Sequence, residues 1–395
     1  MRYNARLVRP VSAPDIEDGT VVVDGTRIAY VGPRAGAPPG FDVELGDVVL
    51  SPGLVNAHTH LDLTALRGRF NGLPFFEWIR ALTVARAALF ADELLESSRA
   101  GIREGLLAGI TTYADTAPND APFEAMRAMG VRGIAYREVF GPDPEQRERS
   151  MDGLTTAVTR MRARESSLVR AGVSPHAPYS VSDELFTAVA QFAKRDGLPL
   201  ATHVAESLDE SSFVATGGGA FGTFLRGRGI AVAPRGRTPV DLLDGNGVLD
   251  TNALLIHCVR CDARDIETIA KRGSGVATCP MSNRYFGHGA APVAAMRAAG
   301  VRVGAGSDSM ASNERMDVLH EAREALCGRG SESAVWELAT LGGARALRLE
   351  HAIGSLEVGK QADLAAFPRA ADPRAPARAT FVAVAGRELV REYRT

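Results

Sequence analysis

Two histidines stand one residue apart in the segment "SPGLVNAHTHLDLTAL", residues 51–66, shortly after the apolar run "DVVL". In an extended strand, residues i and i+2 project from the same side, so the imidazoles of His58 and His60 can reach one point in space. The chain has only eight histidines, and two of them are placed here. This spacing favours a shared metal ion.

Other reactive side chains also stand where apolar runs end: His176, His203 with Glu206, His257 and Asp308. Imidazole and carboxylate donors suit Zn²⁺ or Fe²⁺ and suit Ca²⁺ or Mg²⁺ poorly. We predict one divalent metal ion, Zn²⁺ before Fe²⁺, with the ligands His58, His60, His203 and Asp308. A single histidine near a strand end is more often an ordinary core or surface residue, so the prediction depends on the joint placement. His288, His320 and His351 lack that placement, and we expect His320 and His351 to be structural.

The number of metal ions follows from the fourth predicted strand and its loop. A two-metal site needs a bridging ligand, commonly a modified lysine on that strand, and "VRAGVSPHAPYSVS" contains no lysine. We therefore expect a single metal ion with one coordination position left for water.

Eight short apolar strands alternate with amphipathic helices through the middle of the chain. The strand segments are "DVVLSPGLVNAH", "GITTYAD", "VRGIAYREVFG", "VRAGVSPHA", "LPLATHVAE", "NALLIHC", "GVATCP" and "VRVGAGSD". This alternation predicts an α/β fold with a closed (β/α)₈ barrel, whose strand C-termini converge on one face and hold the active site. An open doubly wound sheet is the alternative, but its GxGxxG fingerprint after the first strand is missing.

The two ends of the chain share a β texture. "TVVVDGTRIAYVGP" alternates around an Asp-Gly turn, and "ADLAAFP" and "FVAVAGRELVRE" are similar. Because chain ends often lie close together, we predict one small β-sandwich built from both termini. The predicted domains are residues 1–50 and 350–395 for the sandwich and 51–349 for the barrel.

Composition indicates which partners to expect. A net charge of −2 and a pI near 6.5 give no electrostatic footprint for nucleic acid or a membrane surface, which leaves a small molecule as the expected partner. The N-terminus lacks a signal-peptide pattern and no stretch reaches the ~20 apolar residues of a membrane span, so we expect a cytoplasmic protein with reduced thiols. Cys258 and Cys261 form a CxxC without a further ligand pair or a thioredoxin-like context, and we interpret both as small buried residues beside His257.

The segments "NAHTHLDLTALRG", "SPHAPYSVS", "THVAES", "LLIHCV" and "GSDSMASN" resemble the amidohydrolase superfamily, in its branch of aromatic deaminases and chlorohydrolases. The resemblance covers essentially the whole chain, including "GSLEVGKQADLAAF" near its end. It implies that His58, His60, His203 and Asp308 bind one divalent metal, usually zinc. Asp308 would take the proton of the attacking water and His257 would hydrogen-bond the attacking hydroxyl, while Glu206 would protonate a ring nitrogen of the substrate.

Glu206 bears on the kind of reaction. Ammonia is a poor leaving group unless it is protonated, whereas chloride leaves without that help. Members of this branch that displace chloride can lack the glutamate, so its presence favours deamination of an amino-substituted heterocycle.

The resemblance also bears on the substrate. "SPHAPYSVS" is similar to the loop through which adenosine-like deaminases contact substrate, here through His176. "ATCPMSNRYFGHGAAPV" and "YREVFGP" look most like the aminodeoxyfutalosine deaminases of the futalosine route to menaquinone, which convert a 6-aminopurine nucleoside to its 6-oxo form. Arg137, Asn283 and Arg284 would meet the polar ends of that substrate, including its benzoate. Trp78, with Glu77, would shape the pocket.

One departure and several alternatives stand beside that interpretation. In the S-adenosylhomocysteine deaminase group an acidic residue follows "EW" in the first loop, whereas "EWIRALTVARAAL" contains none before Asp92. Deamination of adenosine, S-adenosylhomocysteine or methylthioadenosine and release of chloride remain the alternatives within the fold. A barrel kept only as a binding scaffold is the alternative from another class. A homo-oligomer is compatible with the sequence.

Overall fold

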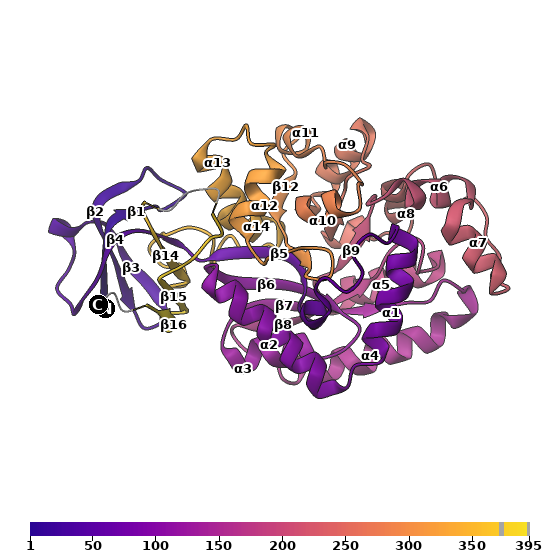
Figure 1. Cartoon of the computed structure of the whole chain (residues 1–395), viewed down its shortest axis with the longest axis horizontal. Coiled ribbons are helices and arrows are strands. Elements are labelled where there is room, and N and C mark those ends of the chain that lie inside the picture. Colours follow the sequence, from indigo (N-terminus) through magenta and orange to yellow (C-terminus); the bar gives the residue numbers. More distant parts are fainter. Residues whose placement is uncertain (371–374, 393–395) are drawn as a thin grey trace.

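The computed structural model describes residues 1–370 and 375–392 and contains a βα barrel with a β-sheet at one end (Figure 1). The barrel strands are β5 (Leu54–His60), β6 (Ile110–Ala117), β7 (Arg132–Val139), β8 (Val169–Pro175), β9 (Ala201–Val204), β10 (Leu254–His257), β11 (Gly275–Thr278) and β12 (Arg302–Ala305). The fold is the predicted (β/α)₈ barrel with a small β domain made from both chain ends.

Parallel pairing runs around the barrel. One run joins β5 to β8 and another joins β9 to β12, and a parallel bridge between Val173 and Leu200 links the two runs. The short strand β13 (Asp308–Ser309) follows β12 and pairs with Thr59 and His60 of β5. At Gly306 the chain passes so close to His58 that an added Cβ would lie 2.8 Å from its backbone nitrogen. Glycine therefore permits the close approach that brings Asp308 beside the two histidines.

Helices surround the strands (Figure 1). They are α1 (Phe75–Ala87), α2 (Ala91–Leu107), α3 (Ala121–Met129), α4 (Arg147–Arg162), α5 (Asp183–Asp196), α6 (Leu208–Thr216), α7 (Gly219–Gly227), α8 (Pro239–Gly245), α9 (Ala263–Arg272), α10 (Pro280–Tyr285), α11 (Val293–Ala298), α12 (Val318–Ala325), α13 (Glu332–Glu337) and α14 (Gly343–Ala346). The 3₁₀ turns are η1 (Arg34–Gly36), η2 (Leu61–Leu66), η3 (Pro144–Gln146) and η4 (Leu249–Thr251), and η5 (Leu338–Gly342) is a π turn.

Local sequence explains where such helices begin and end. In α5 the Ser182 side chain accepts a hydrogen bond from the backbone N–H of Leu185, and Gly197 closes the helix in the left-handed conformation. Between these caps α5 buries Leu185, Phe186 and Val189 against the barrel. The amphipathic stripe and its caps fix both the extent of the helix and the face it packs.

Alternation along the strands separates the barrel interior from its outer layer. Ile134 and Tyr136 of β7 and Leu254 and Ile256 of β10 belong to one buried cluster, whereas Leu255 between the latter two belongs to the outer core. On β9, Ala201 belongs to the same inner cluster, and His203, two residues further along the strand, reaches the C-terminal mouth of the barrel. The mouth is therefore where the polar residues at strand ends meet.

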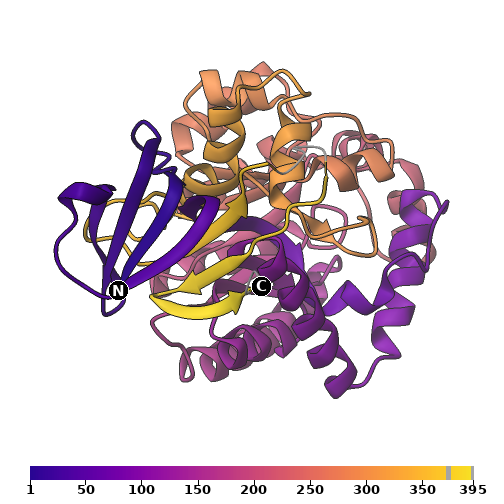
Figure 2. The same cartoon turned by 60° about the vertical axis from the view of Figure 1, so that its left-hand side comes forward.

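Both chain ends contribute to one seven-stranded sheet, in the order β16-β15-β14-β4-β1-β2-β3. Its strands are β1 (Arg2–Val8), β2 (Ile16–Asp24), β3 (Arg27–Pro33), β4 (Asp42–Pro52), β14 (Leu364–Pro368), β15 (Phe381–Val384) and β16 (Arg387–Arg391). Figure 2 shows the indigo and yellow strands side by side. The rings of Tyr3 and Phe381 are 5.1 Å apart although two strands lie between β1 and β15, so the sheet curls around its own core.

The junction of the two parts corrects one expected strand. The segment "DVVLSPGLVNAH" is divided at Gly53 into β4 of the terminal sheet and β5 of the barrel. Gly53 lies against Thr111, where an added Cβ would be 2.2 Å from Thr111 Oγ1. The tight packing at this glycine ends one strand and starts the next, so a single apolar run serves both sheets.

A buried ion pair also links the two parts. Arg132 of β7 donates from Nε and Nη2 to the two carboxylate oxygens of Asp363, at 2.6 and 3.1 Å. Asp363 Oδ1 also accepts the backbone N–H of Ala385 at 2.8 Å. The bidentate pair connects the barrel to the C-terminal strands. Among the helices that the structure describes, none has the length and apolar character needed to cross a membrane.

Candidate metal and catalytic site

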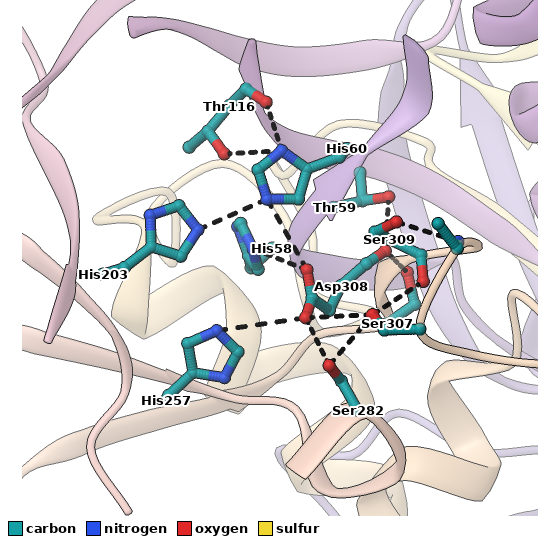
Figure 3. Close-up of polar contacts among 12 residues, drawn as sticks. His58, Thr59, His60, Thr116, His203, His257, Ser282, Ser307, Asp308 and Ser309 are labelled. Atoms are coloured by element: carbon teal, nitrogen blue, oxygen red, sulfur yellow. Dashed lines mark hydrogen bonds and ion pairs between the residues drawn. The ribbon is translucent and has the colours of Figure 1, made fainter. Parts of the chain in front are cut away.

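Four predicted ligands meet at the mouth of the barrel (Figure 3). His58 and His60 come from β5, His203 from β9 and Asp308 from β13, and all four are buried. The Nε2 atoms of His60 and His203 are 3.3 Å apart, and Asp308 Oδ1 lies 3.4 Å from His58 Nε2 and 3.5 Å from His60 Nε2. Two ligand atoms of a tetrahedral zinc site, each ~2.0–2.1 Å from the metal, are spaced by about the same distance.

The protonation of the histidines provides an independent test of a cation site. His60 Nδ1 donates to the carbonyl of Thr116 at 2.7 Å, and His203 Nδ1 donates to the carbonyl of His176 at 3.1 Å, because a carbonyl can only accept. Burial, then neighbouring imidazoles, lowers the pKa of His60 and of His203 well below 6.5, so both rings are neutral. Two Nε2 lone pairs therefore face each other, an arrangement that fits a shared cation held with the usual outer hydrogen bonds.

Asp308 is fixed by its backbone and by serines. Its φ of 55° is unusual for a non-glycine residue and turns the carboxylate towards the histidines. Ser282 donates to Asp308 Oδ2 at 2.5 Å, and Ser312 does so at 3.4 Å. Burial raises the pKa of Asp308, but the neighbouring His58 and His257 outweigh it and hold the pKa well below its ordinary value. The carboxylate is therefore ionised and can act as a ligand or accept a proton.

His257 lies between the two carboxyl groups of the site. Its Nε2 is 3.9 Å from Asp308 Oδ2 and 3.7 Å from Glu206 Oε1, and a positive φ of 73° directs the ring inward. The Nδ1 atom donates to Asn283 Oδ1 at 3.0 Å, so Nε2 carries a lone pair. Asn283, expected to contact substrate, thus orients His257. Cys258 and Cys261 are free thiols, and Cys258 is buried next to this ring.

The backbone of the loop that carries Glu206 is held by the side chain of Glu210. Glu210 accepts the backbone N–H groups of Ala205 and Glu206, each at 2.8 Å. Burial raises the pKa of Glu206 well above 4.5, and Asp308 and Glu210 raise it further. A raised pKa favours the protonated form of this carboxyl, which can donate its proton to a substrate nitrogen.

His176 lies beside the metal-binding candidates, as the sequence suggested. Its Nδ1 donates to Ser180 Oγ at 2.7 Å, because that hydroxyl itself donates to the carbonyl of Ala177. Burial lowers the pKa of His176 to about 3, with Arg86 as the next cause. A neutral His176 can therefore offer Nε2 to a polar atom of a ligand.

An acidic cluster at the mouth was missed by sequence reasoning. We use this name for the three carboxyl groups of Asp62, Asp115 and Glu138 together with the cation beside them, Arg86. Arg86 Nε is 3.3 Å from Asp62 Oδ2, and Arg86 Nη1 is 3.7 Å from Glu138 Oε2. Burial raises the pKa of Glu138 to about 7. Asp62 and Glu138 do stand in the quoted motifs, but no spacing in the sequence places Arg86 of α1 beside them.

His288 is the second feature that was missed. Its Nε2 is 3.7 Å from Glu206 Oε1, and its ring lies edge-on to Phe75 at 4.6 Å and stacks on Phe286 at 5.3 Å. Trp78 of α1 packs against the same Phe286 at 4.9 Å. The rings of Phe75, Trp78, Phe286 and His288 form an aromatic wall beside Glu206. Trp78, predicted to contact the substrate, is buried in this wall.

The two arginines expected to meet a substrate carboxylate have carboxylate partners of their own. Arg137 Nη1 is 2.9 Å from Asp120 Oδ1. The Arg284 side chain is 63% exposed and pairs with Glu324. Among the contacts of residues 1–370 and 375–392, none links Arg284 to the histidines.

Known proteins resemble this chain in sequence and in fold. The model of the amidohydrolase family matches residues 49–389. A 5-methylthioadenosine/S-adenosylhomocysteine deaminase from Moorella thermoacetica is 34% identical over 370 residues, covering 90% of this chain and 82% of that protein.

Two solved structures have the same architecture. A zinc-bound adenosine deaminase from Xanthomonas campestris has a TM-score of 0.85 and 28% identity, covering 99% of this chain and 92% of that one. Aminofutalosine deaminase from Helicobacter pylori, in complex with methylthio-coformycin, has a TM-score of 0.86 at 21% identity, covering 98% and 99%, and shows the shared fold alone. The chain belongs to the amidohydrolase family and is a hydrolase that acts on carbon–nitrogen bonds.

Proposed function

We propose that this protein is a metal-dependent deaminase that converts a 6-aminopurine nucleoside to its 6-oxo product and ammonia. The observation that carries the proposal is the position of the buried Glu206 beside a cluster of histidines and Asp308 that could hold a cation, with His257 between the two carboxyl groups. The adenosine-type deaminases among its relatives support the same reaction.

Each group has a defined task in this proposal. A divalent cation held by His58, His60, His203 and Asp308 would supply the Lewis acidity that makes hydroxide available near neutral pH. Asp308 accepts the proton of the attacking water, and His257 hydrogen-bonds the oxygen as it bonds to C6. Glu206 gives its proton to ring nitrogen N1, which makes C6 electrophilic. The ionised Glu206 then moves the proton of the added hydroxyl to the amine, so that the C6–N6 bond breaks and ammonia leaves, and the proton held by Asp308 restores Glu206.

The choice among nucleosides rests on charge. Aminodeoxyfutalosine is the substrate favoured by the sequence motifs, and its benzoate requires a cationic partner. Arg137 and Arg284 are both paired with carboxylates of the protein. We therefore place an uncharged nucleoside, 5′-methylthioadenosine or adenosine, first, and S-adenosylhomocysteine and aminodeoxyfutalosine after it.

Steady-state kinetics on these four nucleosides, followed by the ultraviolet change from 6-aminopurine to 6-oxopurine, tests the proposal. We expect the highest kcat/KM with 5′-methylthioadenosine, loss of activity after chelation, and recovery with added Zn²⁺. Elemental analysis of the purified protein should give one metal ion per chain. A metal-loaded protein that deaminates none of the four nucleosides would contradict the proposed function, and highest activity on aminodeoxyfutalosine would reverse the ranking.

A further inference from the structure

The loop after α10 places a buried imidazole beside the proposed proton donor. Gly287 and Gly289 flank His288 with φ values of 68° and 98°, and the backbone N–H of His288 donates to the carbonyl of Asn283 at 2.8 Å. The loop thereby fixes the ring between Phe75 and Phe286.

The Nε2 atom of His288 is buried and has no hydrogen-bond partner among the residues described. Its distance of 3.7 Å to Glu206 Oε1 is too long for a direct hydrogen bond. A buried polar atom without a partner is costly, and one beside the proposed catalytic acid is suited to a hydrogen bond with a ligand.

The two imidazoles that approach Glu206 differ in their other neighbours. His257 Nε2 is 3.7 Å from Glu206 Oε1 and also 3.9 Å from Asp308 Oδ2. His288 approaches Glu206 at the same distance, and among the ion pairs of the described chain it has none with Asp308. In the proposed deamination, the hydroxyl added to C6 stays with Asp308 and His257. The amine on C6 is therefore expected on the side of Glu206 that His288 faces.

We propose that His288 is a further catalytic residue, whose Nε2 accepts a hydrogen bond from the departing amine at C6 while Glu206 delivers the proton. The inference rests on the proposed deamination. His288 gains no proton overall. Glu206, ionised after protonating N1, takes the proton of the added hydroxyl and passes it to the amine as the C6–N6 bond breaks. The proton that Asp308 took from water then restores Glu206, and ammonia leaves. Burial lowers the pKa of His288 to about 4, consistent with a neutral ring, and Nε2 is the acceptor in the tautomer that carries its proton on Nδ1.

The test compares two substrates that differ only in the leaving group. One is the 6-amino nucleoside that the wild-type protein turns over best, and the other is its 6-chloro analogue, which has no N–H to donate. For His288→Phe we expect kcat/KM to fall by roughly 10- to 100-fold on the amino substrate, the equivalent of one strong hydrogen bond, with chloride release within about threefold of wild type. His288→Gln, which keeps an acceptor oxygen, should recover most of the amino activity.

Two controls separate this role from packing. His351→Phe makes the same change at an exposed position and should alter neither reaction. The inhibition constant of purine riboside, which carries hydrogen at C6, should be the same for wild type and His288→Phe. Equal losses on both substrates, weaker purine riboside binding, or full amino activity in His288→Phe would each overturn the role of His288. A wild-type protein inactive on every 6-substituted purine nucleoside would instead overturn the proposed function.

Discussion

The lone pairs of His60 and His203 show how single hydrogen bonds prepare the proposed metal site. Each Nδ1 proton is committed to a backbone carbonyl, at 2.7 and 3.1 Å, which leaves each Nε2 unprotonated. Neither carbonyl is visible as a partner in the sequence, because each lies on a neighbouring strand or its following loop. The sequence motif therefore predicts the histidines, whereas their tautomers depend on backbone carbonyls that only the folded barrel brings close.

Replacing Glu206 by glutamine should remove proton delivery while keeping the shape of the side chain. We expect kcat for the 6-amino nucleoside to fall by about 10²- to 10⁴-fold, because an amide cannot exchange the proton that N1 and the amine require. Fixed-time assays of ammonia release measure kcat, and the metal content is determined on the same sample. The control is Glu267→Gln on the exposed side of α9. Retention of activity within a few-fold would show that another group supplies the proton.

Glu138 should make folding stability depend on pH. Its ordinary pKa of 4.5 rises to about 7 in the folded protein, chiefly through burial. The folded state therefore binds a proton that the unfolded chain releases, so this contribution is fully present below pH 4.5 and is lost as pH rises through about 7. The full loss is on the order of 3 kcal/mol.

The measurement is urea unfolding of wild type and Glu138→Gln between pH 5 and 8. We expect the stability of wild type relative to the variant to decline across this interval. A constant difference would mean that Glu138 does not titrate in this range.

At the scale of elements, helix α1 is tied to the barrel by Arg86. This side chain is the cation of the acidic cluster and lies close to both Asp62 and Glu138. Since α1 also carries Phe75 and Trp78, the ion pairs fix the aromatic wall beside Glu206. The position of this helix therefore links the cluster to the shape of the proposed substrate pocket.

Arg86→Met should destabilise the protein by about 3–5 kcal/mol, because it leaves buried carboxylates without their cation. Denaturant unfolding measures the loss, and Arg103→Met, at a side chain that is 58% exposed, is the matched control. The double variant Arg86→Met/Glu138→Gln should lose less than the sum of the single changes, since the two groups interact. Strict additivity would show that the pair is not coupled.

Sequence periodicity predicted the barrel and the convergence of the strand-end residues because both follow from regular alternation. It could not place side chains on short irregular elements. Asn283 and Arg284 are adjacent on α10, yet about 100° separates neighbouring helical positions, so one reaches His257 and the other lies at the surface beside Glu324. His288 depends on two left-handed glycines whose conformation no spacing reveals. The predicted ligand set and catalytic roles stay predictions until metal and activity are measured.

At the scale of the whole molecule, Arg132 and Asp363 connect the barrel to the terminal sheet. The side chains are 8% and 3% exposed, so neither charge can be left to solvent if its partner is removed. Phe367 and Val382 of the terminal sheet also belong to the buried cluster of the outer barrel core, so the ion pair adds a charged contact to an apolar one.

Asp363→Ala should therefore lower the unfolding free energy by about 3–5 kcal/mol and also remove the acceptor of the Ala385 N–H. We expect calorimetry to show a lower Tm and the terminal sheet to lose hydrogen-exchange protection before the barrel. Asp47→Ala, at a side chain that is 65% exposed, provides the control. An unchanged Tm would mean that the ion pair does not couple the two parts.

The pairing of β4 with β14 has a consequence for biosynthesis. During translation β1 to β4 emerge before the barrel, while β14, which covers one edge of β4, emerges after it. The nascent polypeptide therefore carries an uncovered strand edge throughout synthesis of the entire barrel, and such an edge invites pairing with other chains. The sheet that contains β4 can be completed only after β14 has emerged, so we expect chains that stop before β14 to aggregate more readily than the full chain.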